Sequence, residues 1–308
     1  MKYFSIKNTE LHASNMIMGN MRLTQLSLTE AEKLIRTALE EGINLFDHAD
    51  IYGDGRCEEH FAAAIQMSPA IREKMILQSK CGIRAKENYY DFSKEHILAS
   101  VDGILKRLKT EYLDILLLHR PDPLMEPEEV AEAFQKLQEQ GKVNYFGVSN
   151  HNPAQIALLQ KFLPQKLVIN QIQFSIVHTP VIDSGITLNM KTDQSLNRDS
   201  SVLEYCRLHD ITLQAWSPFQ HGVFKGPFLG DLIHFPELNK VIDSIAEKYE
   251  VTSTAIAVAW ITRHPANIQV VLGTTNVQRL KDACKGADLT LTREEWYRIY
   301  KAAGNLIP

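Results

Sequence analysis

The sequence predicts an α/β fold: a single-domain (β/α)8 TIM barrel with an N-terminal β-hairpin, spanning residues 1–308. Apolar, strand-like runs alternate with segments of helical period eight times along the chain. Several of these runs are almost continuously apolar, as in parallel strands that are covered on both faces. A length of 308 residues, with 44% hydrophobic and 23% charged residues, also suits one barrel of this kind.

An open, doubly wound sheet is the competing α/β fold. It would usually carry a glycine-rich GxGxxG turn after its first strand, and the sequence contains no such motif. The sequence also shows no linker, low-complexity segment or internal repeat that would divide it into domains. The closed barrel is therefore the preferred prediction.

The order of the strands follows from the same pattern. Residues 2–14 alternate between polar and apolar positions and predict an extra hairpin ahead of the barrel. The barrel strands are then predicted at residues 15–19, 43–47, 75–80, 113–119, 143–149, 167–172, 211–216 and 268–273.

Capping signals mark where several of the intervening helices begin and end. Ser27 and Glu30 form a predicted capping box, and Thr292 and Glu295 form a second one. Residues 183–201, after the sixth strand, are predicted to be a long loop that could close over a ligand. The helices with the strongest signals are predicted at residues 27–42, 93–108, 126–142, 152–163 and 292–304.

Composition and charge exclude several classes of function. The net charge of −4 and the lack of a basic stripe argue against nucleic acid and membrane surfaces as partners. No apolar run approaches the length of a membrane span, and residues 1–14 do not resemble an apolar signal segment. Four cysteines lie far apart without a CxxC pair, so we expect reduced thiols and a cytoplasmic location: Cys57, Cys81, Cys206 and Cys284.

Ionisable residues gather where the predicted strands end. The segment DHADIYG places Asp47 at the end of the second strand and Tyr52 in the loop just past it, and Lys80 and His119 end the third and fourth. Each residue also has a purely structural explanation. Asp47 could cap a turn, Tyr52 could pack at it, Lys80 could be a surface lysine and His119 a core histidine. Chemistry in such barrels lies at the carboxyl ends of the strands, so four ionisable residues at successive ends favour a shared site.

This set of side chains suits proton transfer to a carbonyl group. A phenol normally has a pKa of about 10, and a nearby ammonium such as Lys80 lowers it. Asp47 would keep that ammonium charged, and a neutral His119 can donate a hydrogen bond to a carbonyl oxygen. The set contains no good nucleophile.

A metal site is the weaker interpretation, and no metal is predicted. Residues 57–60 have a possible ligand spacing, but this segment is typical of a helix start. His48 and Asp50 flank the candidate site and are further conceivable ligands. The sequence contains no HExxH motif and no histidine pair at ligand spacing.

Essentially the whole chain resembles the aldo/keto reductase family. GINLFDHADIYG is similar to the family's signature around its catalytic Asp and Tyr, LQSKCG to the segment with the Lys, and LDILLLHRPDP to the segment with the His. GVSN, NQIQFS, AWSPF and VVLGTTNVQRLKDA follow in the family's order and are similar to its cofactor-binding segments. The motifs DHADIYG and HRPDP are most similar to those of a bacterial branch of general oxidoreductases within the family.

The resemblance implies reduction of an aldehyde or ketone by NADPH. Tyr52 would protonate the carbonyl oxygen, Lys80 and Asp47 would tune that acid, and His119 would orient the carbonyl. Contacts to the cofactor are implied for Gly19, Asn20, Met21, Ser149, Asn150, Gln171, Trp216, Ser217, Pro218, Phe219, Gly273, Thr274, Thr275, Arg279 and Asp282. Arg279, whose fork suits a 2′-phosphate, is the reason to expect NADPH over NADH.

The sequence departs from the family pattern in places that concern the cofactor and the substrate. Gly273 stands where many members carry a basic residue, Ala283 where many carry an Asn, and Met21 where many carry an aromatic residue. Residues 220–231 are implied to fold over the pyrophosphate. Residues implied to border the substrate are Met21, Ile51, Arg84, Arg120, Asp122 and Phe219.

Two other functions remain open. The same barrel could serve as a cofactor-binding regulatory or interaction protein, although the intact set of four ionisable residues disfavours a role without chemistry. A hydrolytic or isomerising barrel would need a metal cluster, or a carboxylate base facing a phosphate site, and neither is found. The predicted partner is a small carbonyl compound, with no nucleic acid, membrane or obligate protein partner.

Overall fold

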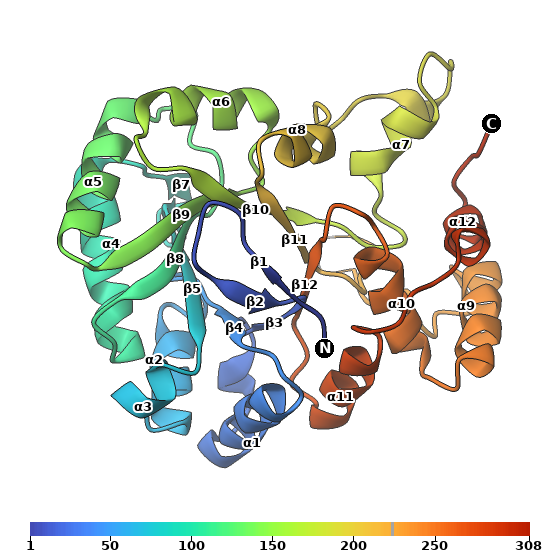
Figure 1. The fold of residues 1–308 in the computed structure, drawn as a ribbon, viewed down its shortest axis with the longest axis horizontal. Helices are drawn as coiled ribbons and strands as arrows, with labels where there is room; N and C mark the ends of the chain where they lie inside the picture. The colour runs from blue at the N-terminus through green and yellow to red at the C-terminus, as the bar shows by residue number, and fades with distance from the viewer. Residues whose placement is uncertain (223–224) are drawn as a thin grey trace.

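The computed structural model describes residues 1–222 and 225–308 and confirms the barrel (Figure 1). Within this part of the chain, eight strands close on themselves, and every neighbouring pair is parallel. In order around the barrel they are β3 (Met16–Gly19), β4 (Leu45–Asp47), β5 (Ile76–Cys81), β8 (Leu113–Leu118), β9 (Val143–Ser149), β10 (Leu167–Gln173), β11 (Thr212–Trp216) and β12 (Gln269–Leu272).

Helices surround the barrel and cover the outer faces of its strands (Figure 1). Both predicted capping boxes are formed, at Ser27 with Glu30 and at Thr292 with Glu295. The helices are α1 (Leu28–Glu40), α2 (Arg56–Ala64), α3 (Pro69–Arg72), α4 (Lys94–Leu108), α5 (Pro127–Glu139), α6 (Pro153–Phe162), α7 (Pro180–Ile186), α8 (Val202–Leu208), α9 (Pro236–Lys248), α10 (Ser253–Thr262), α11 (Val277–Lys285) and α12 (Arg293–Ala302), with 3-10 turns η1 (Leu23–Gln25) and η2 (Asp193–Ser195).

The predicted N-terminal hairpin is also present, as antiparallel strands β1 (Tyr3–Ser5) and β2 (His12–Ser14). Ile6 and Ala13 of this hairpin are buried in one cluster with Ile17 and Leu45, near the starts of β3 and β4. The hairpin therefore closes the end of the barrel at which the strands begin, and the opposite end is left for the site. A second small hairpin, β6 (Ile83–Arg84) with β7 (Tyr89–Tyr90), follows β5.

The prediction of an irregular loop over residues 183–201 is wrong in part. The first four of these residues belong to helix α7, whose start is favoured by Pro180 and whose apolar side is buried through Val181 and Ile182. The Tyr300 hydroxyl in α12 donates to Asp183 Oδ1 at 2.6 Å. Local helix formation and this long-range anchor, which sequence periodicity does not reveal, fix the segment against the C-terminal helix.

The four cysteines are free, as expected, and the structure shows that all four are buried. Among the described residues, no helix has both the length and the apolar character required to cross a bilayer.

Candidate active site

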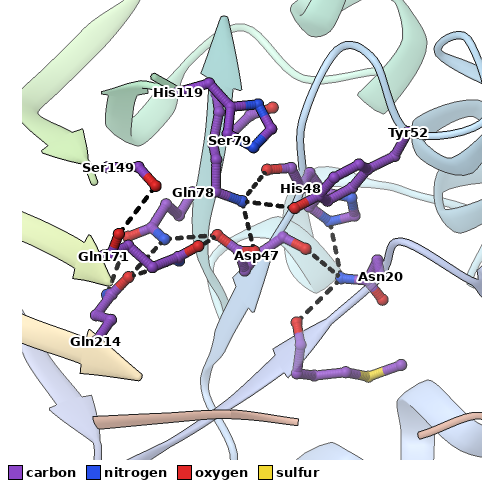
Figure 2. Close-up of polar contacts among 12 residues, drawn as sticks. Asn20, Asp47, His48, Tyr52, Gln78, Ser79, His119, Ser149, Gln171 and Gln214 are labelled. Carbon is purple, nitrogen blue, oxygen red and sulfur yellow. Dashed lines mark hydrogen bonds and ion pairs between the residues drawn. The ribbon is translucent and has the colours of Figure 1, made fainter. Parts of the chain in front are cut away.

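The centre of the site is formed by the buried Asp47 at the end of β4 and the half-buried Tyr52 in the loop after β4 (Figure 2), together with the buried Lys80 of β5. Lys80 Nζ donates to Asp47 Oδ2 at 2.6 Å, to the His48 carbonyl oxygen at 2.8 Å and to the Tyr52 hydroxyl oxygen at 3.2 Å. The Lys80 side chain is fully buried, and these acceptors account for all three of its N–H bonds.

Backbone contacts hold the loop that carries Tyr52. The Asp50 N–H donates to the Lys80 carbonyl oxygen at 3.0 Å, and the Tyr52 N–H donates to the Ala49 carbonyl oxygen at 3.0 Å. Gly55, with φ +82°, then begins α2, and a Cβ atom at this position would lie 2.8 Å from the Arg107 side chain. A glycine is therefore required both for the turn and for the close approach of Arg107.

Two acidic side chains support the loop from behind: the buried Glu58, which is paired with Arg107, and the half-buried Asp50, which lies near both. Glu58 of α2 accepts hydrogen bonds from Arg107 Nε at 2.7 Å and from Ser79 Oγ at 2.7 Å. Burial and the neighbouring Glu58 raise the pKa of Asp50 to about 7, against the opposing effect of Arg107. Asp50 Oδ1 has no hydrogen-bond partner among the described residues.

Burial and charge set the protonation states of Lys80 and Tyr52. Burial alone would lower the pKa of Lys80, but Asp47 and Tyr52 outweigh it and raise the pKa above its usual value. Burial raises the pKa of Tyr52, and Lys80 opposes that rise without cancelling it. The Lys80 ammonium lowers the pKa of the phenol, as expected, but desolvation is the larger effect, and the net shift is therefore upward. At neutral pH the group holds an ammonium and a protonated phenol.

His119 is the first residue after β8 and lies beside Tyr52. The two rings are 5.9 Å apart between centroids and nearly perpendicular, at 80°. Burial, followed by the charges of Lys80 and Arg120, lowers the pKa of His119 well below its usual value. The imidazole is therefore neutral, and its Nδ1 has no partner within residues 1–222 and 225–308. The four residues predicted to carry the chemistry, called the tetrad below, thus lie together: Asp47, Tyr52, Lys80 and His119.

The ends of β9, β10 and β11 bring a second set of predicted residues together. Asn150 Nδ2 donates to Ser149 Oγ at 2.8 Å, and Trp216 Nε1 donates to Asn150 Oδ1 at 3.0 Å. Asn150 and Ser217 both have a left-handed backbone, with φ +60° and +52°, where the chain leaves the barrel. Below, the name cofactor rim covers these residues and those that follow β12: Ser149, Asn150, Trp216, Ser217, Gly273, Thr274, Thr275 and Arg279.

Gln171 connects the cofactor rim with the tetrad. Its side-chain amide donates to Asp47 Oδ1 at 3.0 Å and to Gln214 Oε1 at 2.9 Å (Figure 2). Both amide N–H bonds are thus used inside the barrel, and only Oε1 is left to contact a ligand.

The residues predicted to follow β3 have mixed surroundings. A Cβ atom at Gly19 would lie 3.0 Å from the Leu272 carbonyl oxygen, so the glycine allows β3 to approach β12 closely. Asn20 is buried, and its Nδ2 lies 3.2 Å from both the Asp47 carbonyl oxygen and His48 Nε2. Met21 is partly exposed at 37%. Asn20 therefore supports the strand that carries Asp47.

The remaining predicted residues lie after β11 and after β12. Gly273 is exposed, Thr274 and Thr275 are half-buried, and the exposed Arg279 lies in the first turn of α11. Asp282 accepts a hydrogen bond from Gln278 Nε2 at 3.0 Å. Pro218 is buried and Phe219 packs partly against the core. Residues 220–231 were expected to fold over the pyrophosphate of the cofactor, and residues 223 and 224 of this segment lie outside the described residues.

Two buried glutamines of the site, Gln78 and Gln214, were not among the predicted residues, and a third, Gln269, continues their hydrogen bonds away from Asp47. Gln78 donates to Asp47 Oδ1 at 2.6 Å. A signal was available, because Gln78 and Gln214 stand two positions before Lys80 and Trp216. Side chains two apart on a strand share a face, so these glutamines point inward with the site residues.

No group of three or more His, Cys, Asp or Glu residues within 1–222 and 225–308 could hold a metal ion. Residues 57–60 lie in the first turns of α2, where Glu58 turns toward Arg107 and Ser79.

Comparison with known proteins identifies the family and agrees with the fold. Residues 15–303 match the model of the aldo/keto reductase family. The chain is 37% identical to an uncharacterized oxidoreductase, YcsN, of Bacillus subtilis, over 95% of each chain, and 33% identical to a 6-dehydroglucose reductase of Agrobacterium fabrum, over 96% of this chain and 95% of the relative. A Bombyx mori aldo-keto reductase solved in complex with NADP has the same fold, with a TM-score of 0.73 at 21% identity, over 98% of this chain and 92% of that one. The chain therefore belongs to the aldo/keto reductase family of oxidoreductases.

Proposed function

We propose that the protein reduces an aldehyde or a ketone to an alcohol with NADPH, and that Tyr52 is the general acid. One observation carries this proposal. The protonated Tyr52 hydroxyl lies 3.2 Å from the buried ammonium of Lys80, which a 2.6 Å ion pair with Asp47 keeps charged. Such a pair stabilises the phenolate that forms when the proton leaves.

The donor set fits a nicotinamide dinucleotide. Gln171 Oε1 and the amide of Asn150 offer contacts for a carboxamide, and the half-buried ring of Trp216 offers a flat face for the nicotinamide. The start of α11 offers backbone N–H groups and the exposed Arg279 for a phosphate. When bound, NADPH supplies the hydride.

The residues of this chain then handle the proton and the geometry. As the carbonyl carbon gains a hydride, its oxygen takes the proton from Tyr52, and the phenolate is later reprotonated from water. Lys80 stabilises that phenolate across 3.2 Å. The neutral His119 orients the carbonyl by a hydrogen bond to its oxygen and stabilises the negative charge that develops there.

Polar groups near the mouth of the site favour a hydroxylated substrate. Arg120 follows His119, lies with its guanidinium 5.6 Å from the Trp216 ring centroid and forms no ion pair with a described carboxylate. The relative in Agrobacterium fabrum is a 6-dehydroglucose reductase. Oxidised sugars are therefore the first substrates to test. The four free, buried thiols favour a cytoplasmic enzyme, and we propose no obligate protein partner.

The test is NADPH consumption with a panel of oxidised sugars, simple aldehydes and ketones, in wild type and Tyr52→Phe. We expect turnover in wild type and a loss of roughly 100-fold or more in Tyr52→Phe, with NADPH binding unchanged. Binding of NADPH without turnover of any carbonyl would contradict the reductase. Absence of NADPH binding would contradict the cofactor assignment.

A further inference from the structure

Four glutamines form a continuous hydrogen-bonded column across the inside of the barrel. Gln78, Gln171, Gln214 and Gln269 come from β5, β10, β11 and β12, and none of them is more than 3% exposed. At one end of the column is Asp47, and at the other the Ser14 carbonyl oxygen, which accepts from Gln269 Nε2 at 2.7 Å. Figure 2 shows the end of the column next to Asp47.

The direction of every hydrogen bond in the column is fixed from both ends. A carbonyl oxygen can only accept, so Gln269 must turn its NH2 group to Ser14 and its Oε1 to Gln214 Nε2, 3.1 Å away. Gln214 Oε1 then accepts from Gln78 Nε2 at 2.8 Å. This arrangement leaves Gln78 with an N–H for the carboxylate of Asp47, which also can only accept.

Asp47 is consequently held through both of its oxygens. Oδ1 accepts from Gln78 at 2.6 Å and from Gln171 at 3.0 Å, whereas Oδ2 accepts from Lys80 at 2.6 Å. The shorter of the two hydrogen bonds to Oδ1 comes from Gln78, the residue two positions before Lys80 on the same strand. One strand thus supplies a donor to each oxygen of the carboxylate.

We propose that Gln78 is a positioning residue that fixes the Asp47 carboxylate and, through it, the Lys80 ammonium beside Tyr52. Without Gln78, one N–H from Gln171 would remain on Oδ1, and the carboxylate could rotate about its side-chain bonds. Lys80 would then lose the fixed partner that keeps its third N–H directed at Tyr52. The expected effect of Gln78 on turnover rests on the proposed function, whereas its expected effect on the position of the Lys80 ammonium does not.

The deciding measurement is the hydrogen-exchange rate of the Lys80 ammonium protons at neutral pH, observed by NMR with ¹⁵N-lysine and assigned with Lys80→Met. Gln78→Met keeps the length of the side chain and removes its donors. We expect exchange to become faster by about tenfold or more, which corresponds to the loss of one charge-assisted hydrogen bond. In the active enzyme, kcat should fall while the KM for NADPH stays within about twofold.

Gln269→Met is the matched control. Gln269 is as buried as Gln78 and its loss also leaves amide groups unpaired, but it does not contact Asp47. A purely structural role predicts equal changes in Lys80 exchange for the two variants, or none, and either result would overturn the proposal. A clearly larger change in Gln78→Met supports it.

Gln78→Asn, which keeps the amide but draws it back by one methylene, provides a second test if Gln78→Met does not fold. It should speed Lys80 exchange in the same direction, and exchange no faster than in wild type would overturn the proposal. Because exchange is measured without cofactor or substrate, it decides the role of Gln78 even if the wild type reduces no carbonyl.

Discussion

The tetrad and the cofactor rim lie on the same end of the barrel but differ in how their polar groups are partnered. Asp47 and Lys80 are at most 2% exposed and bonded to each other, and Tyr52 is bonded to Lys80. On the rim, Trp216 is half-buried and Arg279 is exposed. The groups proposed to move the proton are already bonded to one another, whereas Trp216 and Arg279, proposed to hold the cofactor, are more exposed to solvent than Asp47 and Lys80.

This difference in burial predicts which property a substitution in each region should change: stability, turnover or cofactor affinity. A prearranged, dehydrated group gives strong electrostatic effects, but it depends on every member being satisfied. An exposed group depends on its ligand, so that its loss weakens binding and leaves folding intact. Changes in the tetrad should therefore affect stability and turnover together, and changes in the rim should affect only affinity.

The largest effect is expected for Lys80→Met. It removes the charge that Asp47 Oδ2 faces and leaves a buried carboxylate without its counter-ion. We expect the free energy of unfolding in urea to fall by about 3–5 kcal/mol, and turnover to fall roughly thousandfold.

The double variant Asp47→Asn, Lys80→Met separates the two losses. Its neutral amide leaves no buried charge uncompensated, so part of the stability should return while turnover remains lost. A double variant that is no more stable than Lys80→Met would show that the ion pair does not explain the cost.

A smaller effect is expected for Asp50→Asn, and it depends on pH. The unfolded chain releases the Asp50 proton near a pKa of about 4, whereas the folded protein keeps it up to about pH 7. Between these values the folded state binds the extra proton, so wild-type stability falls as pH rises through this window. An asparagine at this position cannot ionise, so we expect the stability of the variant to rise relative to wild type from about pH 4 to about pH 7, by at most about 4 kcal/mol.

Urea unfolding of both proteins at the two ends of that pH range checks the sign. Parallel stability curves for the two proteins would contradict the protonated state of Asp50.

The contrast between the two regions also explains what the sequence could predict. The barrel follows from alternating strand and helix periods. The tetrad could be predicted because Asp47, Lys80 and His119 stand at strand ends and Tyr52 follows in the loop just past one of them. The column of glutamines could not be predicted, because Gln78 and Gln214 are 136 residues apart and meet only when the barrel closes. The net rise in the pKa of Tyr52 could not be predicted for a related reason: desolvation, its largest cause, depends on packing, which a sequence does not display.

On the rim, Arg279→Ala is expected to weaken NADPH binding by about 10- to 100-fold, the value of one charge-assisted contact to phosphate. Binding of NADH, which lacks the 2′-phosphate, and the thermal midpoint should not change. Lys285→Ala is the matched control, since it removes the same charge from the other end of α11. If the two variants lose the same affinity, Arg279 contributes only general charge and not a specific contact.

The smallest effect is expected for Gly273→Arg, which adds a cation to the rim. A Cβ atom at this position would meet no atom within 4 Å, and the backbone there is not left-handed, so a side chain can be accepted. Stability should change by less than about 0.5 kcal/mol, and NADPH affinity should rise about two- to tenfold, as for an exposed ion pair. Gly273→Ala separates the charge from the side chain itself and should leave affinity unchanged. A gain in NADPH affinity with no gain for NADH would assign the new contact to the 2′-phosphate. Equal gains for both cofactors would place it on the pyrophosphate, and the rim near β12 would then not be the element that distinguishes the two cofactors.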